Sequence, residues 1–126
     1  MRWEIRYEEA DQVVRVKTSG TMTLPPLKQM VAETLVEAAK HNAYRFLMDH
    51  RDVIVKLSTA ETYTLPEIFK AMGREAHHRV AILYTQDTDT RAFAFHEYRA
   101  QDLGISHKIF LTTETAMAWL AGDILT

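Results

Sequence analysis

Apolar and polar residues alternate at the start of the chain, and a valine-rich segment follows after a short polar break. Residues 2–8 place three bulky apolar side chains between charged ones, and this alternation with a period of two is typical of a strand with one solvent-exposed face. The charged, exposed face marks the strand as an edge of its sheet. Residues 13–18 are predicted to be a second strand, and the polar residues between the two segments favour an antiparallel hairpin.

A helical spacing follows the predicted hairpin. Apolar residues between Leu27 and Ala39 recur every three or four positions, and polar residues fill the other side. Pro25 and Pro26 suit the first turn of a helix, and Thr23 is placed to cap it. This segment is therefore predicted to be an amphipathic helix.

Two short segments have the apolar character of strands that are covered on both faces, residues 44–49 and 80–84. Residues 108–111 are predicted to be a further strand, and helical patterns separate the three segments. Strands connected by helices are expected to run parallel with right-handed crossovers. The pattern predicts one α/β domain over residues 1–126, with a five-stranded, mostly parallel sheet, an antiparallel first edge strand and helices on both faces.

Capping signals divide the helical patterns in the second half of the chain. Ser58 and Thr64 are each followed three positions later by a glutamate, which predicts a helical turn at Ser58 and a longer helix from about Leu65. Residues 88–90 are predicted to cap a third helix that ends at Gly104.

Composition narrows the function classes. The 126 residues carry a net charge of −2 without long runs of one sign, so we expect no nucleic-acid partner. The absence of cysteine excludes disulfides, thiolate catalysis and cysteine-ligated metal sites. No glycine-rich loop joins a strand to a helix, and we expect no cofactor. No apolar run approaches the length of a membrane span and the first residues do not read as a signal peptide, so we expect a cytoplasmic protein without an integral membrane segment.

Four ionisable residues follow the apolar middle of the central predicted strand, in the order Asp-His-Arg-Asp at positions 49–52. Ligands of open α/β sheets bind beyond the carboxyl ends of parallel strands, so we predict a rim there that contacts a ligand or a partner. The predicted rim consists of Asp49, His50, Arg51, Asp52, Ser58, Asp87 and Thr113. The alternative is that Asp49 accepts local backbone N–H bonds while Arg51 pairs with Asp52 on the surface.

Six histidines raise the question of a metal site. No two of them lie four positions apart on one helix, and the adjacent His77 and His78 are expected to point in different directions. We therefore predict no metal centre. His96 falls among apolar residues on the helical wheel and is predicted to be a hydrogen-bonded core imidazole. A base that faces a pocket is the alternative.

The predicted third helix carries a second apolar patch, opposite the face that we expect to be buried. Phe95 and Tyr98 are its aromatic members. One apolar face is enough to cover a sheet, so a second one indicates a homodimer contact or a lid over a ligand. The alternative is that a neighbouring helix or loop covers the patch. A homodimer is the predicted oligomer.

The order of the predicted elements resembles a known family. The resemblance also rests on residues 49–52 at the end of the central strand, residues 57–60 before a Leu-Pro helix, and the closing segment 114–120. Together they resemble the SpoIIAA-like proteins, small bacterial relatives of the STAS domains of anti-sigma-factor antagonists, which are also grouped with the CRAL-TRIO lipid-binding domains. Over nearly the whole chain, the resemblance implies a SpoIIAA-like α/β fold, a bacterial origin and a regulatory role in signalling.

The resemblance also raises the question of a phosphorylation switch. In the antagonists, a serine directly after the aspartate of the central strand is phosphorylated, whereas His50 follows Asp49 here. The nearest serine is Ser58. Its hydroxyl can cap the following helix, and a phosphate there would also be favoured by the helix N-terminus. Ser58 is predicted to be a helix cap, with a phosphosite as the alternative.

The expected function is that of a non-enzymatic regulatory or binding domain, which acts through contacts with a protein or a small ligand. A first alternative is a carrier of a lipid or another apolar molecule, which requires a cavity lined by the second helix and by apolar residues after the central strand. These are Val53, Ile54, Val55 and Leu57. A second alternative is a small enzyme that uses Asp49, His50 or His96 near the end of that strand.

Overall fold

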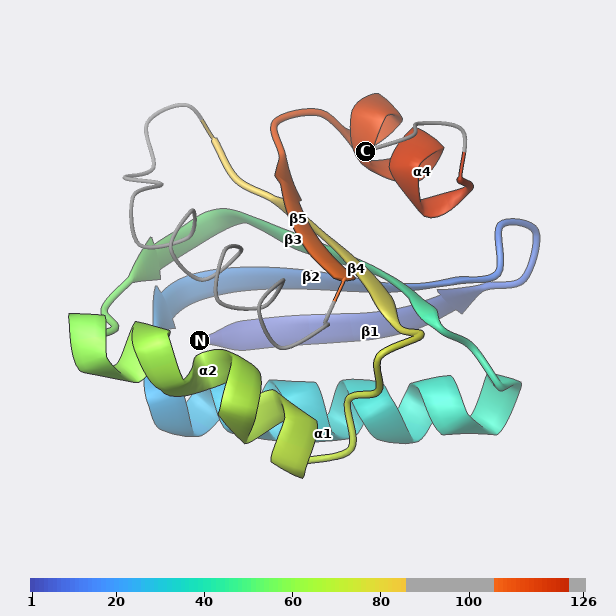
Figure 1. The fold of residues 1–126 in the computed structure, drawn as a ribbon. Coiled ribbons are helices and arrows are strands. Elements are labelled where there is room, and N and C mark those ends of the chain that lie inside the picture. The colour runs from blue at the N-terminus through green and yellow to red at the C-terminus, as the bar shows by residue number, and fades with distance from the viewer. Residues whose placement is uncertain (86–105, 123–126) are drawn as a thin grey trace.

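A computed structural model describes residues 1–85 and 106–122 of the chain (Figure 1). Within these ranges it contains five strands and three helices. In chain order they are β1 (Arg2–Glu8), β2 (Val13–Met22), α1 (Leu24–His41), β3 (Arg45–Val55), α2 (Thr59–Ala71), β4 (Arg79–Leu83), β5 (Ser106–Phe110) and α4 (Thr113–Leu120). The predictions made for residues 88–90, Gly104, Asp87, Phe95, His96 and Tyr98 lie outside the described residues.

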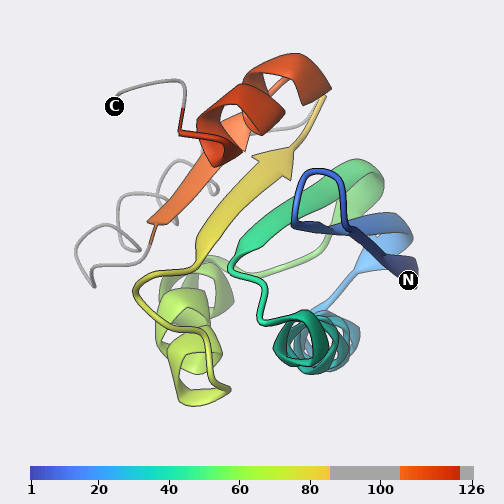
Figure 2. The ribbon, with the colours of Figure 1, turned by 90° about the vertical axis from the view of Figure 1, so that its right-hand side faces the viewer.

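The five strands follow one another across the sheet in chain order. β1 runs antiparallel to β2 and all other neighbours are parallel, as the sequence predicts. The connections through α1 and α2 move in the same direction across the sheet, and right-handed crossovers then place both helices on one face. Figure 2 shows this layering, with α4 on the opposite face. The predicted α/β architecture with helices on both faces is confirmed.

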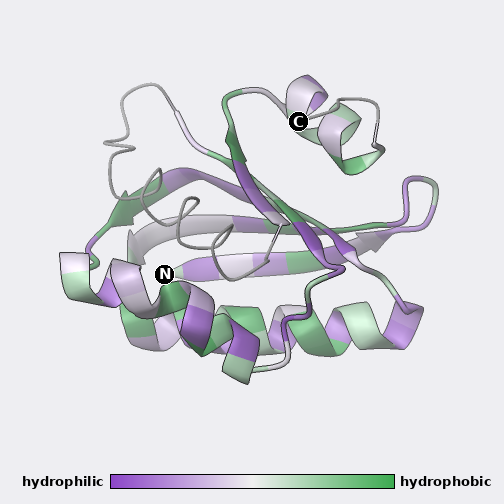
Figure 3. Ribbon diagram, in the orientation of Figure 1, coloured by the Kyte–Doolittle hydropathy of each residue, from purple (hydrophilic) through white to green (hydrophobic). Residues whose placement is uncertain are grey.

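Two apolar cores lie on the two faces of the sheet, because neighbouring strand residues point to opposite sides. The larger core packs α1 and α2 against the sheet, and its buried members include Val14, Val16, Met30, Phe46, Met48, Leu65, Phe69 and Ile82. The smaller core packs α4 against the other face and consists of Val13, Leu47, Ala81, Leu83, Ala116, Trp119 and Leu120. Figure 3 shows hydrophobic and hydrophilic bands alternating along α1 and α2, as expected of helices with one buried face.

Charged side chains line the part of the sheet that α4 leaves uncovered. A shallow hollow on this face involves β1, β2 and β3, and its charged members are Glu4, Arg6, Arg15, Lys17 and Asp49. We call this the open sheet face. Its polarity agrees with the alternation that marks β1 as a wet edge strand.

The central strand β3 is longer than the sequence predicts. The apolar segment 44–49 indicated an end at Asp49, whereas β3 continues to Val55. The extension forms because β2 is also long and pairs with β3 as far as Met22, which lies opposite Val55. On its other side β3 is paired with β4 only as far as Leu83, which lies opposite Asp49.

A β-bulge interrupts the pairing of β2 with β3. Lys17 is paired with Asp49, and the next pair is formed by Ser19 and Asp52. Two residues of β3 therefore lie opposite Thr18 alone, and the local twist of the strand is expected to increase.

The extra residue in the bulge reverses the alternation of the side chains beyond it. Val53 and Val55 consequently pack against the larger core. Ile54 points away from that core and is 63% exposed.

A single helix, α2, replaces the two helical segments predicted after β3. The hydroxyl of Ser58 accepts from the N–H of Glu61, and the carboxylate of Glu61 accepts from the N–H of Ser58. This predicted capping box is confirmed. The second predicted cap is wrong, because Thr64 lies inside α2 and donates its hydroxyl to the carbonyl of Glu61. Pro66 also lies inside the helix and leaves one backbone acceptor without its usual partner.

The first helix begins as the sequence predicts. Pro25 and Pro26 lie in its first turn, and Thr23 stands at the N-cap position, although its side chain makes no capping bond. Asn42 ends the helix in a left-handed conformation with φ of 52°. Among residues 1–85 and 106–122, no helix combines the length and the apolarity needed to cross a lipid bilayer.

Candidate functional site

The bulge in β3 positions a buried histidine. His50 is only 3% exposed, and its Nδ1 lies 2.6 Å from the hydroxyl oxygen of Thr18. That hydroxyl donates its one proton to the backbone carbonyl of Asp49 at 3.0 Å, so it accepts from an N–H at Nδ1 of His50. Burial lowers the pKa of His50 to about 4, although the charge of Asp49 acts in the opposite direction. The ring is therefore neutral at pH 7, with Nε2 as an acceptor.

Asp49, the preceding residue, points to the open sheet face. Its carboxylate accepts from Nε and Nη2 of Arg51 at 2.9 and 2.8 Å, and from the backbone N–H of Arg51 at 3.2 Å. Burial alone would raise the pKa of Asp49, but the hydrogen bonds and charge of Arg51 and the charge of Lys17 outweigh it and lower this pKa. Arg51 thus pairs with Asp49, whereas the surface alternative in the sequence analysis paired it with Asp52.

The structure divides the predicted rim between two faces. Asp49 lies level with the last residues of β4 and β5, because it is paired with Leu83, which is paired with Phe110. His50 lies at the same level but on the side of the larger core. The sheet separates the two side chains, so the carboxylate of Asp49 and the imidazole of His50 do not face a common substrate position.

The other candidates of the rim differ in exposure. Arg51, Asp52 and Ser58 are exposed, and they follow one another closely at the end of β3 and the start of α2. Thr113 is half-buried as the first residue of α4. The contact role of these residues stays a prediction.

A small cavity lies between the sheet and the two helices of the larger core. Its volume is about 60 Å³. The lining residues are Leu27, Met30, Val31, Thr34, Leu35, Phe46, Met48, His50, Phe69, Arg74, Val80, Ile82 and His107. The lining predicted for a lipid carrier is confirmed only for the second helix, which contributes Phe69. It is wrong for residues 53–55 and Leu57, because none of them contributes to the cavity. Pockets for drug-sized ligands have volumes of about 300–1,000 Å³, so this cavity is suited to a much smaller group.

Arg74 brings a positive charge to one end of this cavity. The residue is 6% exposed, and burial lowers its pKa to about 10, so it stays charged at pH 7. Nη1 donates to Nδ1 of His107 at 3.3 Å, and Nη2 donates to the carbonyl of Ser106 at 3.0 Å. Because a guanidinium can only donate, Nδ1 of His107 is unprotonated.

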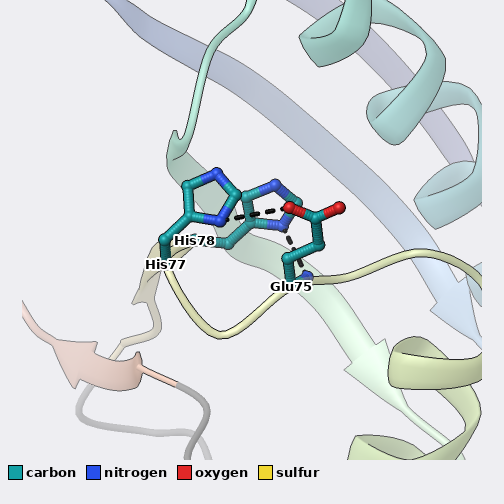
Figure 4. A group of neighbouring side chains, drawn as sticks. All are labelled: Glu75, His77 and His78. Atoms are coloured by element: carbon teal, nitrogen blue, oxygen red, sulfur yellow. Dashed lines mark hydrogen bonds and ion pairs between the residues drawn. The ribbon is translucent and has the colours of Figure 1, made fainter.

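One carboxylate and two imidazoles gather in the turn before β4. Figure 4 shows Glu75, His77 and His78, and one ligand atom from each lies within 4.8 Å of the others. Nδ1 of His77 is 3.2 Å from Oε2 of Glu75, and the two imidazole centroids are 4.7 Å apart. The prediction that the adjacent histidines point in different directions is wrong, because that rule holds for an extended strand and these residues lie in a turn.

Such a donor set suits a transition-metal cation, but one of its donors is engaged. The backbone N–H of Glu75 donates to Nδ1 of His78 at 3.0 Å, so the proton of this neutral ring is on Nε2. Burial and the charges of His77 and Arg74 lower the pKa of His78, against the opposing charge of Glu75. Neither nitrogen of His78 offers a free lone pair, and three-ligand binding of a metal would require this ring to break its present bond.

Arg74 and the bulge are the features that the sequence analysis missed. An arginine after a helix and a glycine is most often exposed, so nothing in the pattern marked Arg74 as buried. The bulge depends on how β2 pairs with β3. The one available signal was the pair of valines at positions 53 and 55, which continue a strand-like alternation beyond the charged residues.

Comparison with known proteins places this fold among anti-sigma factor antagonists and their structural relatives. The unphosphorylated form of the anti-sigma factor antagonist SpoIIAA has a TM-score of 0.57 at 13% identity, covering 99% of this chain and 100% of that one. An anti-sigma factor antagonist from Mycobacterium paratuberculosis has a TM-score of 0.59 at 16% identity, covering 94% of each chain.

An uncharacterised protein with a SpoIIAA-like fold from Shewanella loihica has a TM-score of 0.59 at 18% identity, covering 94% of this chain and 92% of that one. No family model matches the sequence, and no curated protein matches it. The identities are low and the coverage is nearly complete, so these likenesses confirm the predicted SpoIIAA-like fold.

Proposed function

We propose that this chain is a non-enzymatic binding domain that recognises a protein partner through the end of β3 and the start of α2. We call residues 51–63 the β3–α2 surface. Most of its side chains are exposed. It includes three of the predicted contact residues, Arg51, Asp52 and Ser58, and it follows directly on the bulge.

The exposure of Ile54 is the observation that carries this proposal. Ile54 is 63% exposed, and Tyr63 is also among the large apolar side chains that reach solvent. Exposed polar residues flank Ile54 in the sequence, namely Arg51, Asp52 and Ser58. An apolar centre with a polar border is the usual composition of a protein contact.

The free edge of β3 adds a second reason. β4 ends at Leu83, opposite Asp49, so no strand among residues 1–85 and 106–122 pairs with the β4 side of β3 beyond this point. Backbone N–H and C=O groups at such an edge are available for pairing with an extended segment of another chain.

The geometry favours binding over acid–base catalysis. Asp49 is held in a bidentate bond with Arg51 on the open sheet face, and His50 is buried on the other face. General acid–base catalysis needs groups that reach the same substrate atoms, and these two groups are separated by the sheet.

The similar structures support a regulatory partner. Two of them are anti-sigma factor antagonists, which are proteins that act on another protein. For this chain we therefore infer a signalling role in the bacterial cytoplasm, in which the partner is a regulatory protein.

A photocrosslinking residue at position 54 tests the proposal in the cells that produce the protein. p-Benzoylphenylalanine in place of Ile54 should capture one partner, which mass spectrometry identifies. The purified partner should then bind the wild-type chain, and Ile54→Asp should weaken binding by about tenfold or more, because a charge replaces an apolar side chain at the centre of the contact.

Val36 provides the matched control. It is 59% exposed on α1, so Val36→Asp introduces the same charge at a similarly exposed apolar position away from the β3–α2 surface. Binding should be unchanged in Val36→Asp. Equal affinity of the Ile54→Asp and wild-type chains for the captured partner would refute the proposal, as would equal crosslinking from positions 54 and 36.

A further inference from the structure

A second candidate site lies beneath α1 and α2, where the cavity is lined by a buried arginine that forms no ion pair within residues 1–85 and 106–122. Arg74 lines this cavity and is buried. Its Nη groups donate to Nδ1 of His107 and to the carbonyl of Ser106, which are both uncharged acceptors. Its Nε is buried and has no hydrogen-bond partner in the described part of the chain.

Among residues 1–85 and 106–122, no carboxylate forms an ion pair with Arg74. A buried charge is costly unless an opposite charge or a full set of hydrogen bonds compensates it. The guanidinium of Arg74 therefore has the capacity to bind an anion, and its planar set of N–H donors matches a carboxylate.

Among the residues that the structure describes, two other arginines also have a buried Nε without a hydrogen-bond partner, but their charges are placed differently. Arg45 and Arg79 are half-buried, so their charged groups are partly solvated. The guanidinium of Arg79 lies over the ring of Trp119 at 4.3 Å, and that of Arg45 over the ring of Tyr44 at 4.9 Å. Neither arginine lines the cavity.

The rest of the cavity near Arg74 is apolar. Met30 of α1 and Met48 of β3 line it, together with Val80 and Ile82 of β4. Its other imidazole, His50, lies four residues beyond Phe46 in β3, which is about 13 Å at roughly 3.3 Å per residue. Phe46 is level with Val80 and His107, so His50 and the Arg74 end are far apart along the strands.

We propose that this cavity binds a short-chain monocarboxylate, whose carboxylate pairs with Arg74 and whose hydrocarbon part packs between Met30 and Met48. The cavity volume of about 60 Å³ is a few times the volume of about 10–15 Å³ that a single water molecule needs, and it admits only a few heavy atoms. Propionate combines this size with one negative charge and an apolar end. The site is independent of the protein contact at the β3–α2 surface.

Methionine methyl signals provide a direct test with the full chain. Met30 and Met48 line the cavity, whereas Met117 packs in the smaller core on the other face and serves as an internal reference. Sodium propionate is titrated at constant ionic strength, with sodium chloride as the replacement salt. The Met30 and Met48 signals should shift and saturate, and the Met117 signal should not follow them.

Propionamide separates the role of charge from the role of shape. It is close to propionate in size but has no charge. Its affinity should be lower than that of propionate by at least about tenfold, because it lacks a charge-assisted bond to the guanidinium. Arg74→Leu should weaken propionate binding by a similar factor. Arg45→Leu, which removes an arginine that does not line the cavity, should leave it unchanged.

Three results would overturn the proposal: shifts that grow linearly without saturation, equal affinities for propionate and propionamide, or unchanged propionate affinity in Arg74→Leu. Replacing an unpaired buried charge by an apolar side chain is expected to preserve the fold, and the same spectra report whether it does. If Arg74→Leu does not fold, the comparison of propionate with propionamide on the wild-type chain decides the question.

Discussion

The hydroxyl oxygen of Thr18 lies 2.6 Å from Nδ1 of His50, and this contact joins β2 to β3 at the bulge. Both residues are buried, and the same hydroxyl donates to the carbonyl of Asp49. The hydroxyl therefore satisfies two buried polar groups of β3 at the point where the regular pairing of the strands is interrupted.

Thr18→Val should lower the free energy of unfolding by about 1–3 kcal/mol, because it leaves Nδ1 of His50 and the Asp49 carbonyl without their partner. Valine preserves the shape of the threonine side chain, so the change reports the hydroxyl. Urea denaturation followed by circular dichroism measures it. Thr21→Val in the exposed part of β2 is the control and should change stability little. A loss in Thr18→Val no greater than that in Thr21→Val would contradict the structural role of the contact.

Stability should fall as the pH is lowered from 7 to 5, and His50 should cause part of the loss. The pKa of His50 is about 4 in the folded chain, and it is about 6.5 for an unperturbed histidine in the unfolded chain. Between these values the unfolded state binds more protons, so protonation favours unfolding. The contribution of His50 between pH 7 and pH 5 is about 2 kcal/mol.

The pH dependence is measured by denaturant unfolding of the wild-type chain and of His50→Gln at both pH values. The variant should have a smaller loss between pH 7 and pH 5, whatever its stability at pH 7. His78 also has a lowered pKa and contributes in the same direction to both proteins, so it cancels in the comparison. Equal losses in the two proteins would mean that His50 is not buried as a neutral ring.

Ser58→Ala should lower the free energy of unfolding by about 0.5–2 kcal/mol, because it removes the hydroxyl that accepts from the N–H of Glu61 in the capping box. Thermal denaturation measures the loss. Thr59→Ala, one residue into the helix and also exposed, is the matched control and should be nearly neutral. A Ser58→Ala protein as stable as the wild type would show that the cap has no energetic role.

No stoichiometric phosphate is expected on Ser58. Its oxygen is engaged in the cap, and the carboxylate of Glu61 already accepts from the backbone N–H of Ser58 beside it. Incubation with kinases from the lysate of the host, followed by measurement of the intact mass, tests this expectation. A phosphate that maps to Ser58 would instead support a switch at the start of α2.

The chain is expected to form a homodimer through the apolar patch of Phe95 and Tyr98, which lies outside the described residues. Light scattering at several concentrations should give twice the mass of the 126-residue chain. Replacing both aromatic residues by aspartate should shift the mass to that of the monomer. A monomer mass for the wild-type chain at high concentration would end this prediction.

The sheet could be predicted from the sequence because its signals are local. Alternation in residues 2–8 marked the edge strand, and the apolar segments around Phe46 and Ile82 marked strands covered on both faces. The separation of these strands by helices then determined that they run parallel. Each of these inferences depends on residues that are close together in the chain.

The candidate site could be predicted only in part, because its geometry depends on distant contacts. The charged residues after Met48 resembled the end of a strand, but pairing with β2 extends the strand to Val55. Asp49 and His50 are neighbours within this longer strand, so the regular alternation of side chains places them on opposite faces instead of together on one rim. Arg74 is buried by elements that are far from it in sequence, so its burial could not be predicted from the residues around it in the chain.

The bulge also gives β3 one position at which its length can change without a change in which side chains face inward. Two residues of β3 lie opposite Thr18, and the pairs on either side keep the two strands in step, so Val53 and Val55 face the larger core as Met22 does. Deleting one residue between Asp49 and Asp52 would remove the bulge and let the strands pair without interruption. Val53 and Val55 would still face that core, and the tip of the strand would lose its extra twist without turning over.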